Sequence, residues 1–142
     1  LTPAFIMPKR AFPLASTDRE IFLKKMMARV NLIPKKNRAG FAYAVSKYFV
    51  IWYARHEAAR FGAKGVRVLS ITPGNFETPM GELEKDEAQT YLKFNAIKRL
   101  GKPDEIAALF EAVSDPAIGY LTGSDLICDG GCIASGAGAF SR

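Results

Sequence analysis

The sequence predicts an α/β fold whose parallel sheet is incomplete within the chain. Three observations indicate this class: an apolar helix is predicted over residues 41–61, a β-branched strand follows at 66–71, and a second strand is predicted at 125–128 after another helix. Helix, strand and loop in this order are typical of α/β proteins. Two strands are too few for an independently stable sheet, so the fold needs further cover.

Length and composition bound the remaining classes. The 142 residues are 49% hydrophobic, which suits one globular domain. No apolar run approaches the roughly 20 residues that span a bilayer, and the first residues show no export signal, so we expect a cytoplasmic protein without membrane attachment. Cys128 and Cys132 have no further Cys or His nearby, so we expect reduced thiols and no metal site.

The positive charge is concentrated at the start of the chain. Residues 1–40 carry nine Lys or Arg against Asp18 and Glu20, a balance of +7 within a total of +6. A nucleic-acid surface is one interpretation. Because these basic residues alternate with Phe, Ile, Leu and Met, we favour a folded segment with a solvated basic face, and we do not expect nucleic acid as a partner.

This basic segment, residues 1–40, contains the first predicted helix, at about 17–33. Thr17-Asp18-Arg19-Glu20 has the form of a capping box. Apolar residues then follow at helical spacing, as expected of an amphipathic helix: Phe22, Leu23, Met26, Met27, Val30 and Ile33. We place the α/β part at 41–133 and a flexible Gly/Ala/Ser-rich tail at 134–142.

The second predicted helix, residues 41–61, is apolar around most of its circumference. Gly62 follows where a left-handed residue is usually required, so we expect the helix to end there. Only Ser46 and Lys47 lack an apolar body between Phe41 and Ala54. Such a helix must be covered on more than one side.

The remaining elements alternate between strands and helices. A strand is expected at 66–71, before Pro73-Gly74, because β-branched residues dominate it. Pro103-Asp104-Glu105 predicts a helix start, with proline and acids in its first turn. The other expected elements are a charged helix at 82–95, a strand at 125–128 and a turn at 129–131.

Tyr43 and Lys47 are the candidate chemical pair. They are four residues apart, so their side chains share one face of the predicted helix. A phenol of pKa ~10 holds its proton tightly near neutrality, and a nearby ammonium stabilises the phenolate. The pair therefore suits general acid/base transfer of a proton to or from a substrate oxygen.

The order of motifs around this pair resembles the short-chain dehydrogenase/reductase family across residues 41–131. Five motifs carry the resemblance: Tyr43-Ala44-Val45-Ser46-Lys47, Pro73-Gly74-Asn75-Phe76-Glu77-Thr78, Arg99-Leu100-Gly101-Lys102-Pro103-Asp104-Glu105-Ile106-Ala107, Leu121-Thr122-Gly123 and Asp129-Gly130-Gly131. The resemblance implies the C-terminal half of a Rossmann-like doubly wound parallel sheet. It also implies an NAD- or NADP-dependent oxidoreductase that interconverts a secondary alcohol and a carbonyl compound.

The resemblance assigns roles to six residues. Tyr43 would be the general acid/base, and Lys47 would stabilise its phenolate and bind the nicotinamide ribose. The loop after the first strand would contact the nicotinamide end, which makes four residues candidates for cofactor binding: Pro73, Gly74, Phe76 and Thr78. Open α/β sheets bind ligands beyond the carboxyl ends of their strands, where this loop lies.

Two features of the family are missing from these residues. No Gly-rich turn between a strand and a helix is found to hold the cofactor's pyrophosphate. The family's substrate-orienting serine and helix asparagine precede the tyrosine, yet Ser16, the only serine before Tyr43, is interpreted as a connector. We therefore expect the 142 residues alone to be inactive and to bind cofactor weakly.

Residues 1–40 resemble the insert of hydroxysteroid dehydrogenase and carbonyl reductase members. This similarity suggests an apolar alcohol or ketone substrate near Phe22, Met26 and Met27. Family members pair the tyrosine helix across a dimer axis, so we expect a homo-oligomer formed through Tyr48, Phe49, Trp52 and Tyr53. The alternative to an enzyme is a non-catalytic dimerisation or interaction module.

Overall fold

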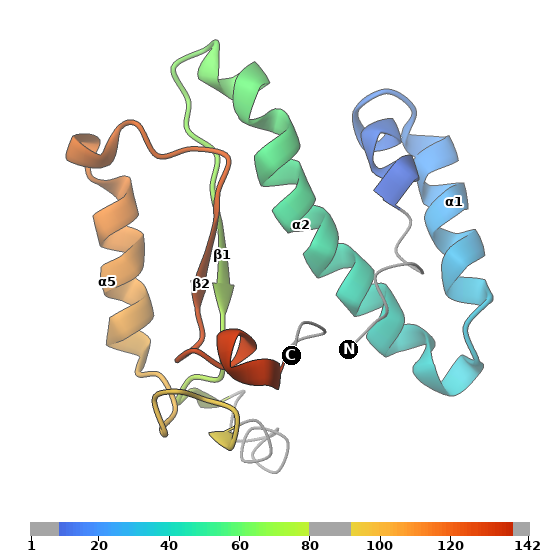
Figure 1. The fold of residues 1–142 in the computed structure, drawn as a ribbon. Helices are drawn as coiled ribbons and strands as arrows, with labels where there is room; N and C mark the ends of the chain where they lie inside the picture. Colours follow the sequence, from blue (N-terminus) through green and yellow to red (C-terminus); the bar gives the residue numbers. More distant parts are fainter. Residues whose placement is uncertain (1–8, 80–91, 138–142) are drawn as a thin grey trace.

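The structure is a computed structural model that describes residues 9–79 and 92–137. The helix expected at 82–95 lies almost entirely outside the described residues. The main elements in Figure 1 are the 3-10 helix η1 (Lys9–Ser16), the helices α1 (Arg19–Asn31), α2 (Arg38–Gly62) and α5 (Pro103–Ser114), and the strands β1 (Ser70–Pro73) and β2 (Asp125–Cys128). Short helical turns lie at Lys35–Asn37, Pro116–Ile118 and Ile133–Ala137.

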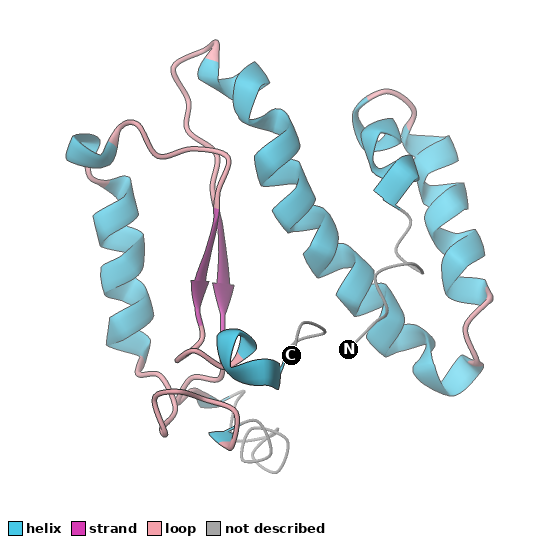
Figure 2. Cartoon of the chain, viewed as in Figure 1, coloured by secondary structure: helices cyan, strands magenta, loops and turns pink. Residues whose placement is uncertain are grey.

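The two strands form a parallel sheet with α2 and α5 on opposite sides (Figures 1 and 2). The register pairs Ser70 with Asp125 and Pro73 with Cys128. Helices on both faces of a parallel sheet define a doubly wound α/β arrangement. The described residues contain two strands of it, which confirms the predicted class and its incompleteness.

The first strand begins later than the sequence predicts. The prediction of 66–71 is wrong because a strand is defined by its partner, and β2 begins only at Asp125. Ahead of the ladder, Val68 N–H donates to Thr122 Oγ1 at 3.0 Å, and its carbonyl accepts from Gly123 N–H at 2.7 Å. Gly123, at φ 68°, bends the partner segment away from ladder geometry.

Two predicted helix ends also need correction. Gly62 is not left-handed: it is the last residue of α2, and the positive φ of 72° falls at Gly65, inside the turn that carries Val66 N–H back to the Phe61 carbonyl. Asp18, not Thr17, caps α1, because its side chain accepts from Ile21 N–H at 2.9 Å. Both corrections move a boundary by a few residues and leave the helices in place.

An aromatic cluster holds η1 and α1 against α2. Phe12 is 0% exposed, and its ring lies 5.3 Å from that of Phe49 and 5.5 Å from that of Trp52, measured between centroids. Phe41 and Val45 complete the buried centre, and partly buried side chains surround it: Phe22, Met26, Val30, Ile33, Tyr48, Phe49 and Trp52. One side of the predicted all-round apolar helix is therefore covered within the chain.

The aromatic cluster includes residues for which other roles were predicted from the sequence. Tyr48, Phe49 and Trp52, expected at a dimer axis, pack on Phe12 of the same chain. Phe22 and Met26, expected near an apolar substrate, pack on the same cluster.

Within residues 9–79 and 92–137, no helix combines the length and apolar character needed to cross a membrane.

Candidate active site

Tyr43 and Lys47 lie on the sheet-facing side of α2. Ala58 marks this side, because its Cβ lies 3.1 Å from where a Cβ on Gly123, just ahead of β2, would stand. Residues four and seven apart share a helix face, so the stripe runs from Ala58 through buried Ala54 to Lys47 and Tyr43. Small alanines line it where the helix approaches the strands.

The direction of the chain relates the start of α2, which carries this pair, to the end of β1, where the nicotinamide loop, residues 73–78, begins. The chain passes along α2, turns near Gly65 and returns antiparallel to it through β1 (Figure 1). The first turns of α2 and the carboxyl end of β1 therefore point toward the same end of the molecule. Tyr43 and Pro73 belong to these two ends.

The pair is close and open to solvent. Lys47 Nζ lies 5.3 Å from the centroid of the Tyr43 ring, and Tyr43 is 65% exposed. Ser46 lies between them in sequence, and its Oγ donates to the Tyr43 backbone carbonyl at 2.7 Å. The Ser46 hydroxyl therefore does not donate to the Tyr43 phenol.

Ser16 is held far from Tyr43. Its hydroxyl donates to Glu57 Oε1 at 3.3 Å, and Glu57, 4% exposed, also pairs with Arg60. Glu57 lies fourteen residues after Tyr43 on α2, or about 21 Å along the axis at 1.5 Å per residue. Ser16 joins η1 to α2, in agreement with its interpretation as a connector.

The loop after β1 is held against the end of β2. Gly74 N–H donates to the Cys128 carbonyl at 2.9 Å, and a Cβ at Gly74 would stand 2.6 Å from Asp129 Cα. Since Gly74 has no positive φ, this close approach and not backbone conformation requires glycine here. Pro73 is exposed and Thr78 is half-buried, so both stay within reach of a bound molecule.

Phe76 is half-buried, and its ring lies against Gly101 in the segment that precedes α5. Its backbone pairs with Gly101 in a parallel bridge, with Gly101 N–H donating to the Asn75 carbonyl at 2.9 Å and Glu77 N–H to the Gly101 carbonyl at 2.8 Å. The structure therefore places the four loop candidates on one short segment, but it directs the Phe76 ring at Gly101.

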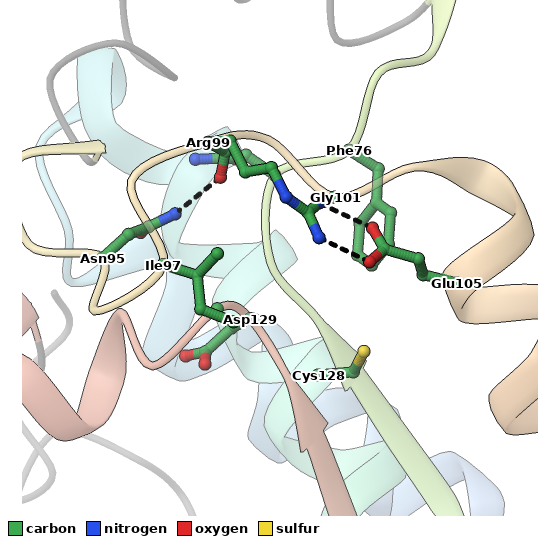
Figure 3. A pocket seen from close by; sticks show the side chains of 10 residues that line it. Phe76, Asn95, Ile97, Arg99, Gly101, Glu105, Cys128 and Asp129 are labelled. Atoms are coloured by element: carbon green, nitrogen blue, oxygen red, sulfur yellow. Dashed lines mark hydrogen bonds and ion pairs between the residues drawn. The ribbon is translucent and has the colours of Figure 1, made fainter.

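A small pocket lies behind this loop (Figure 3), with a volume of about 100 Å³. Ligand pockets are typically several hundred Å³, so this one is too small for a cofactor or substrate. Asn95, 4% exposed, donates from Nδ2 to the Arg99 carbonyl at 3.3 Å, while its Oδ1 has no hydrogen-bond partner among the residues that the structure describes. Asn95 could not be predicted from the sequence, because a single Asn in a charged stretch has no distinctive spacing.

Arg99 and Glu105 close one side of the pocket with a two-pronged ion pair, at 2.7 and 2.6 Å between the guanidinium and carboxylate atoms. Lys102 N–H also donates to Glu105 Oε2 at 2.7 Å. The Arg99 hydrogen bonds, helped by the Lys102 amide, lower the pKa of Glu105 to about 2. The sequence contained both residues in one motif but did not reveal their pairing.

The turn after β2 does not offer free backbone amides to a phosphate, because a carboxylate already accepts from two of them. The turn from β2 into Ile133–Ala137 is a strand, Gly-Gly and helical turn, the arrangement that often binds phosphate. Here Asp129 occupies it: its carboxylate accepts from Gly131 N–H at 2.8 Å and from Ile133 N–H at 2.9 Å. A phosphate would meet a carboxylate instead of free amides.

Solved structures of other proteins share the fold of the described residues. A short-chain dehydrogenase/reductase from Serratia marcescens is 32% identical with a TM-score of 0.60, covering 64% of this chain and 37% of that one. A short-chain type dehydrogenase/reductase from Mycobacterium marinum is 30% identical with a TM-score of 0.60, covering 64% and 36%. These neighbours confirm the Rossmann-like class.

Relatives found by sequence include a named reductase and a named dehydrogenase. The 3-oxoacyl-[acyl-carrier-protein] reductase FabG of Vibrio cholerae is 33% identical over 84% of this chain and 52% of its own, and the galactitol 2-dehydrogenase (L-tagatose-forming) of Cereibacter sphaeroides is 37% identical over 67% and 39%. The chain thus spans about half or less of these relatives' lengths. A family model described as enoyl-(acyl carrier protein) reductase matches residues 1–132. The chain belongs to the short-chain dehydrogenase/reductase family.

Proposed function

We propose that this chain carries the catalytic pair of an NAD(P)-dependent oxidoreductase that interconverts a secondary alcohol and a carbonyl compound. One observation carries the proposal: Lys47 Nζ lies 5.3 Å from the Tyr43 ring, on the sheet-facing side of α2. Family membership supports the reaction type, because short-chain dehydrogenases/reductases use NAD(P). The name of the Cereibacter relative supports the substrate class, because forming tagatose from galactitol oxidises a secondary alcohol.

Each residue has a defined task in this proposal. Tyr43 Oη gives a proton to the carbonyl oxygen during reduction and takes it from the hydroxyl during oxidation. Lys47 stabilises the phenolate that Tyr43 forms in between. Bound NAD(P) would supply or accept the hydride. Pro73, Gly74 and Thr78 would orient its nicotinamide end, with Gly74 held in place by its contact with Asp129.

The test is the Tyr43→Phe variant of the natural gene product that contains these residues. Phenylalanine keeps the ring beside Lys47 and removes only the proton carrier. We expect NAD(P)-linked turnover of a panel of secondary alcohols to fall at least ~100-fold, the usual contribution of a general acid/base. Cofactor affinity, measured by nicotinamide fluorescence, should stay within about twofold, since ring and ammonium both remain.

Tyr120→Phe is the matched control, because Tyr120 is fully exposed and lies outside the site. It removes the same hydroxyl from the same residue type and should leave turnover unchanged. Turnover of Tyr43→Phe within about twofold of wild type would remove Tyr43 from its proposed role.

Cofactor binding by the 142-residue chain tests whether it holds the pyrophosphate site as well as the catalytic pair. We infer that residues outside these 142 hold the pyrophosphate, since Asp129 takes the amides of the turn after β2. Titration of the 142-residue chain with NADH should therefore give no saturable fluorescence change and no turnover. Saturable binding at micromolar NADH would contradict this part of the proposal.

We also infer self-association, with α2 at or near the interface. Several large apolar side chains remain exposed, among them Val50 on α2 and Ile127 on β2. Exposed apolar surface of this kind often marks an interface. Light scattering should show a mass above that of one chain, whereas a well-folded monomer would rule the association out. Such a module without turnover would be the non-catalytic alternative.

A further inference from the structure

We propose that Phe76 and Gly101 form an anchor that positions the nicotinamide loop, residues 73–78, and that the Phe76 ring serves this anchor instead of touching the cofactor. The inference rests on the proposed function of this loop. Phe76 and Gly101 are positioning residues in it, because they act through Pro73, Gly74 and Thr78.

The contact between Phe76 and Gly101 leaves no room for any side chain at position 101. A Cβ there would stand 2.5 Å from Phe76 Cε1, 2.6 Å from Cδ1 and 3.0 Å from Cζ. The backbone of Gly101 has no positive φ, so conformation alone would tolerate alanine. The aromatic ring is therefore the reason that this position requires glycine.

Backbone hydrogen bonds extend the contact along the loop. Gly101 N–H donates to the Asn75 carbonyl at 2.9 Å, and the Gly101 carbonyl accepts from Glu77 N–H at 2.8 Å. These two bonds lie on either side of Phe76. A displacement of Gly101 away from the Phe76 ring would therefore pull on Asn75 and Glu77, and Glu77 is the immediate neighbour of Thr78.

The segment that presents Gly101 is itself braced. Arg99 and Glu105 form their ion pair across Gly101, at 2.7 and 2.6 Å (Figure 3). Asn95 fixes the other side by donating to the Arg99 carbonyl at 3.3 Å. The preceding Ile97 N–H donates to the Gly130 carbonyl at 2.9 Å and ties the segment to the turn after β2.

The nicotinamide loop is thus held by two separate contacts. Gly74 packs on Asp129 at the end of β2, and Phe76 packs on Gly101 ahead of α5. Catalytic geometry is sensitive to errors of about 1 Å, which can cost on the order of 100-fold in rate. Displacing the second point should misplace the nicotinamide end while leaving the rest of a bound dinucleotide where it is.

The experiment compares Gly101→Ala with Phe76→Leu/Gly101→Ala in the natural gene product. The alanine should force the ring aside, and the smaller leucine should make room for it. We expect Gly101→Ala to lower kcat at least ~10-fold without changing the affinity for ADP-ribose, which lacks the nicotinamide. The double variant should recover most of the lost kcat. Gly62→Ala is the control, because nothing lies within 4 Å of its added Cβ.

A second measurement reads the anchor without turnover. Hydrogen exchange of the Glu77 amide should accelerate in Gly101→Ala, slow again in the double variant and stay unchanged in Gly62→Ala. It should also accelerate in Phe76→Ala, which removes the ring and needs no tolerance of a clash. Unchanged exchange in Phe76→Ala would overturn the anchor even where Gly101→Ala does not fold.

The outcomes separate this inference from the proposed function. Gly101→Ala with kcat within about twofold of wild type, or a double variant no better than the single one, would overturn the positioning role. A parallel loss of kcat and ADP-ribose affinity would indicate general unfolding and would also overturn it. If Tyr43→Phe stayed active, the proposed function would fail, and the Glu77 exchange would still report on the anchor.

Discussion

The helical part of the molecule, residues 9–62, and the sheet part, residues 66–79 and 92–137, are stabilised in different ways. Every buried hydrophobic residue among those described belongs to the helical part: Ala11, Phe12, Phe41, Val45 and Ala54. The sheet part buries two polar residues instead, Ser70 and Asn95. The helical part is held by apolar rings, and the sheet part by hydrogen bonds and close glycine contacts. The same kind of substitution should therefore act differently in the two parts.

This difference has a physical consequence for where function can lie. Apolar burial is non-directional and tolerates small movements of side chains. Hydrogen bonds and glycine contacts depend on distances of a few tenths of an ångström, as at Gly74 and Gly101. The part that must hold a loop in a fixed place uses the more directional interactions. The aromatic cluster instead fixes α2, which carries Tyr43.

The largest effect should come from Phe12→Ala in the helical part. Phe12 is 0% exposed and contacts the rings of Tyr48, Phe49 and Trp52. Truncating a buried phenylalanine leaves a cavity and costs about 3 to 5 kcal/mol. Urea unfolding should show this loss, and near-ultraviolet circular dichroism should lose its aromatic signal.

Phe110→Ala is the matched control, because Phe110 on α5 is 56% exposed. It removes the same side chain where little area is buried, and the free energy of unfolding should change by less than about 1 kcal/mol. Equal losses for the two variants would show that the aromatic cluster is not the core of the helical part.

In the sheet part the corresponding change is Asp125→Ala, with a smaller effect. The Asp125 carboxylate accepts from Ser70 Oγ at 2.7 Å and from Thr72 Oγ1 at 2.9 and 3.0 Å, across the two strands. Alanine would leave the buried Ser70 hydroxyl without its acceptor, at a cost of about 1 to 3 kcal/mol. Urea unfolding measures the loss.

A double-mutant cycle tests whether this loss comes from the hydrogen bond. Adding Ser70→Ala to Asp125→Ala removes the donor as well as the acceptor, so the second change should cost less than it does in the wild type. Independent, additive losses would mean that the strands are held by something other than this polar contact.

The sequence predicted most of the helical part and less of the sheet part for the same reason. Helical periodicity is local, so α1, α2 and α5 and the shared face of Tyr43 and Lys47 could be predicted from spacing alone. The start of β1 depends on β2, more than fifty residues away, and was placed four residues too early. The Phe76–Gly101 contact joins positions twenty-five residues apart, and no local pattern indicates it.

The next prediction concerns the pH dependence of Glu105→Gln. The pKa of Glu105 is about 2 in the folded chain, below its ordinary value of 4.5, chiefly because Arg99 hydrogen-bonds the carboxylate. A lowered folded pKa stabilises the protein above pH 4.5, and this contribution is lost as the pH falls toward 2. Wild type should therefore have the higher Tm at pH 7, and the two curves should converge near pH 2.

Glu111→Gln is the control for this comparison, since Glu111 lies on the same helix and has no ion pair among the described residues. Its Tm should follow wild type at every pH. A constant difference between Glu105→Gln and wild type down to pH 2 would mean that the ion pair does not stabilise the segment around Gly101.

The smallest expected effect on stability is that of Tyr43→Phe, the variant with the largest expected effect on turnover. Tyr43 is 65% exposed, its ring lies near Lys47, and its hydroxyl makes no buried hydrogen bond to residues 9–79 or 92–137. We expect the free energy of unfolding to change by less than about 0.5 kcal/mol in urea. A loss above 1 kcal/mol would mean that the phenol helps to hold α2 in place. A neutral result would instead show that the fold does not depend on the Tyr43 hydroxyl, so that a loss of turnover in the same variant could not be attributed to unfolding.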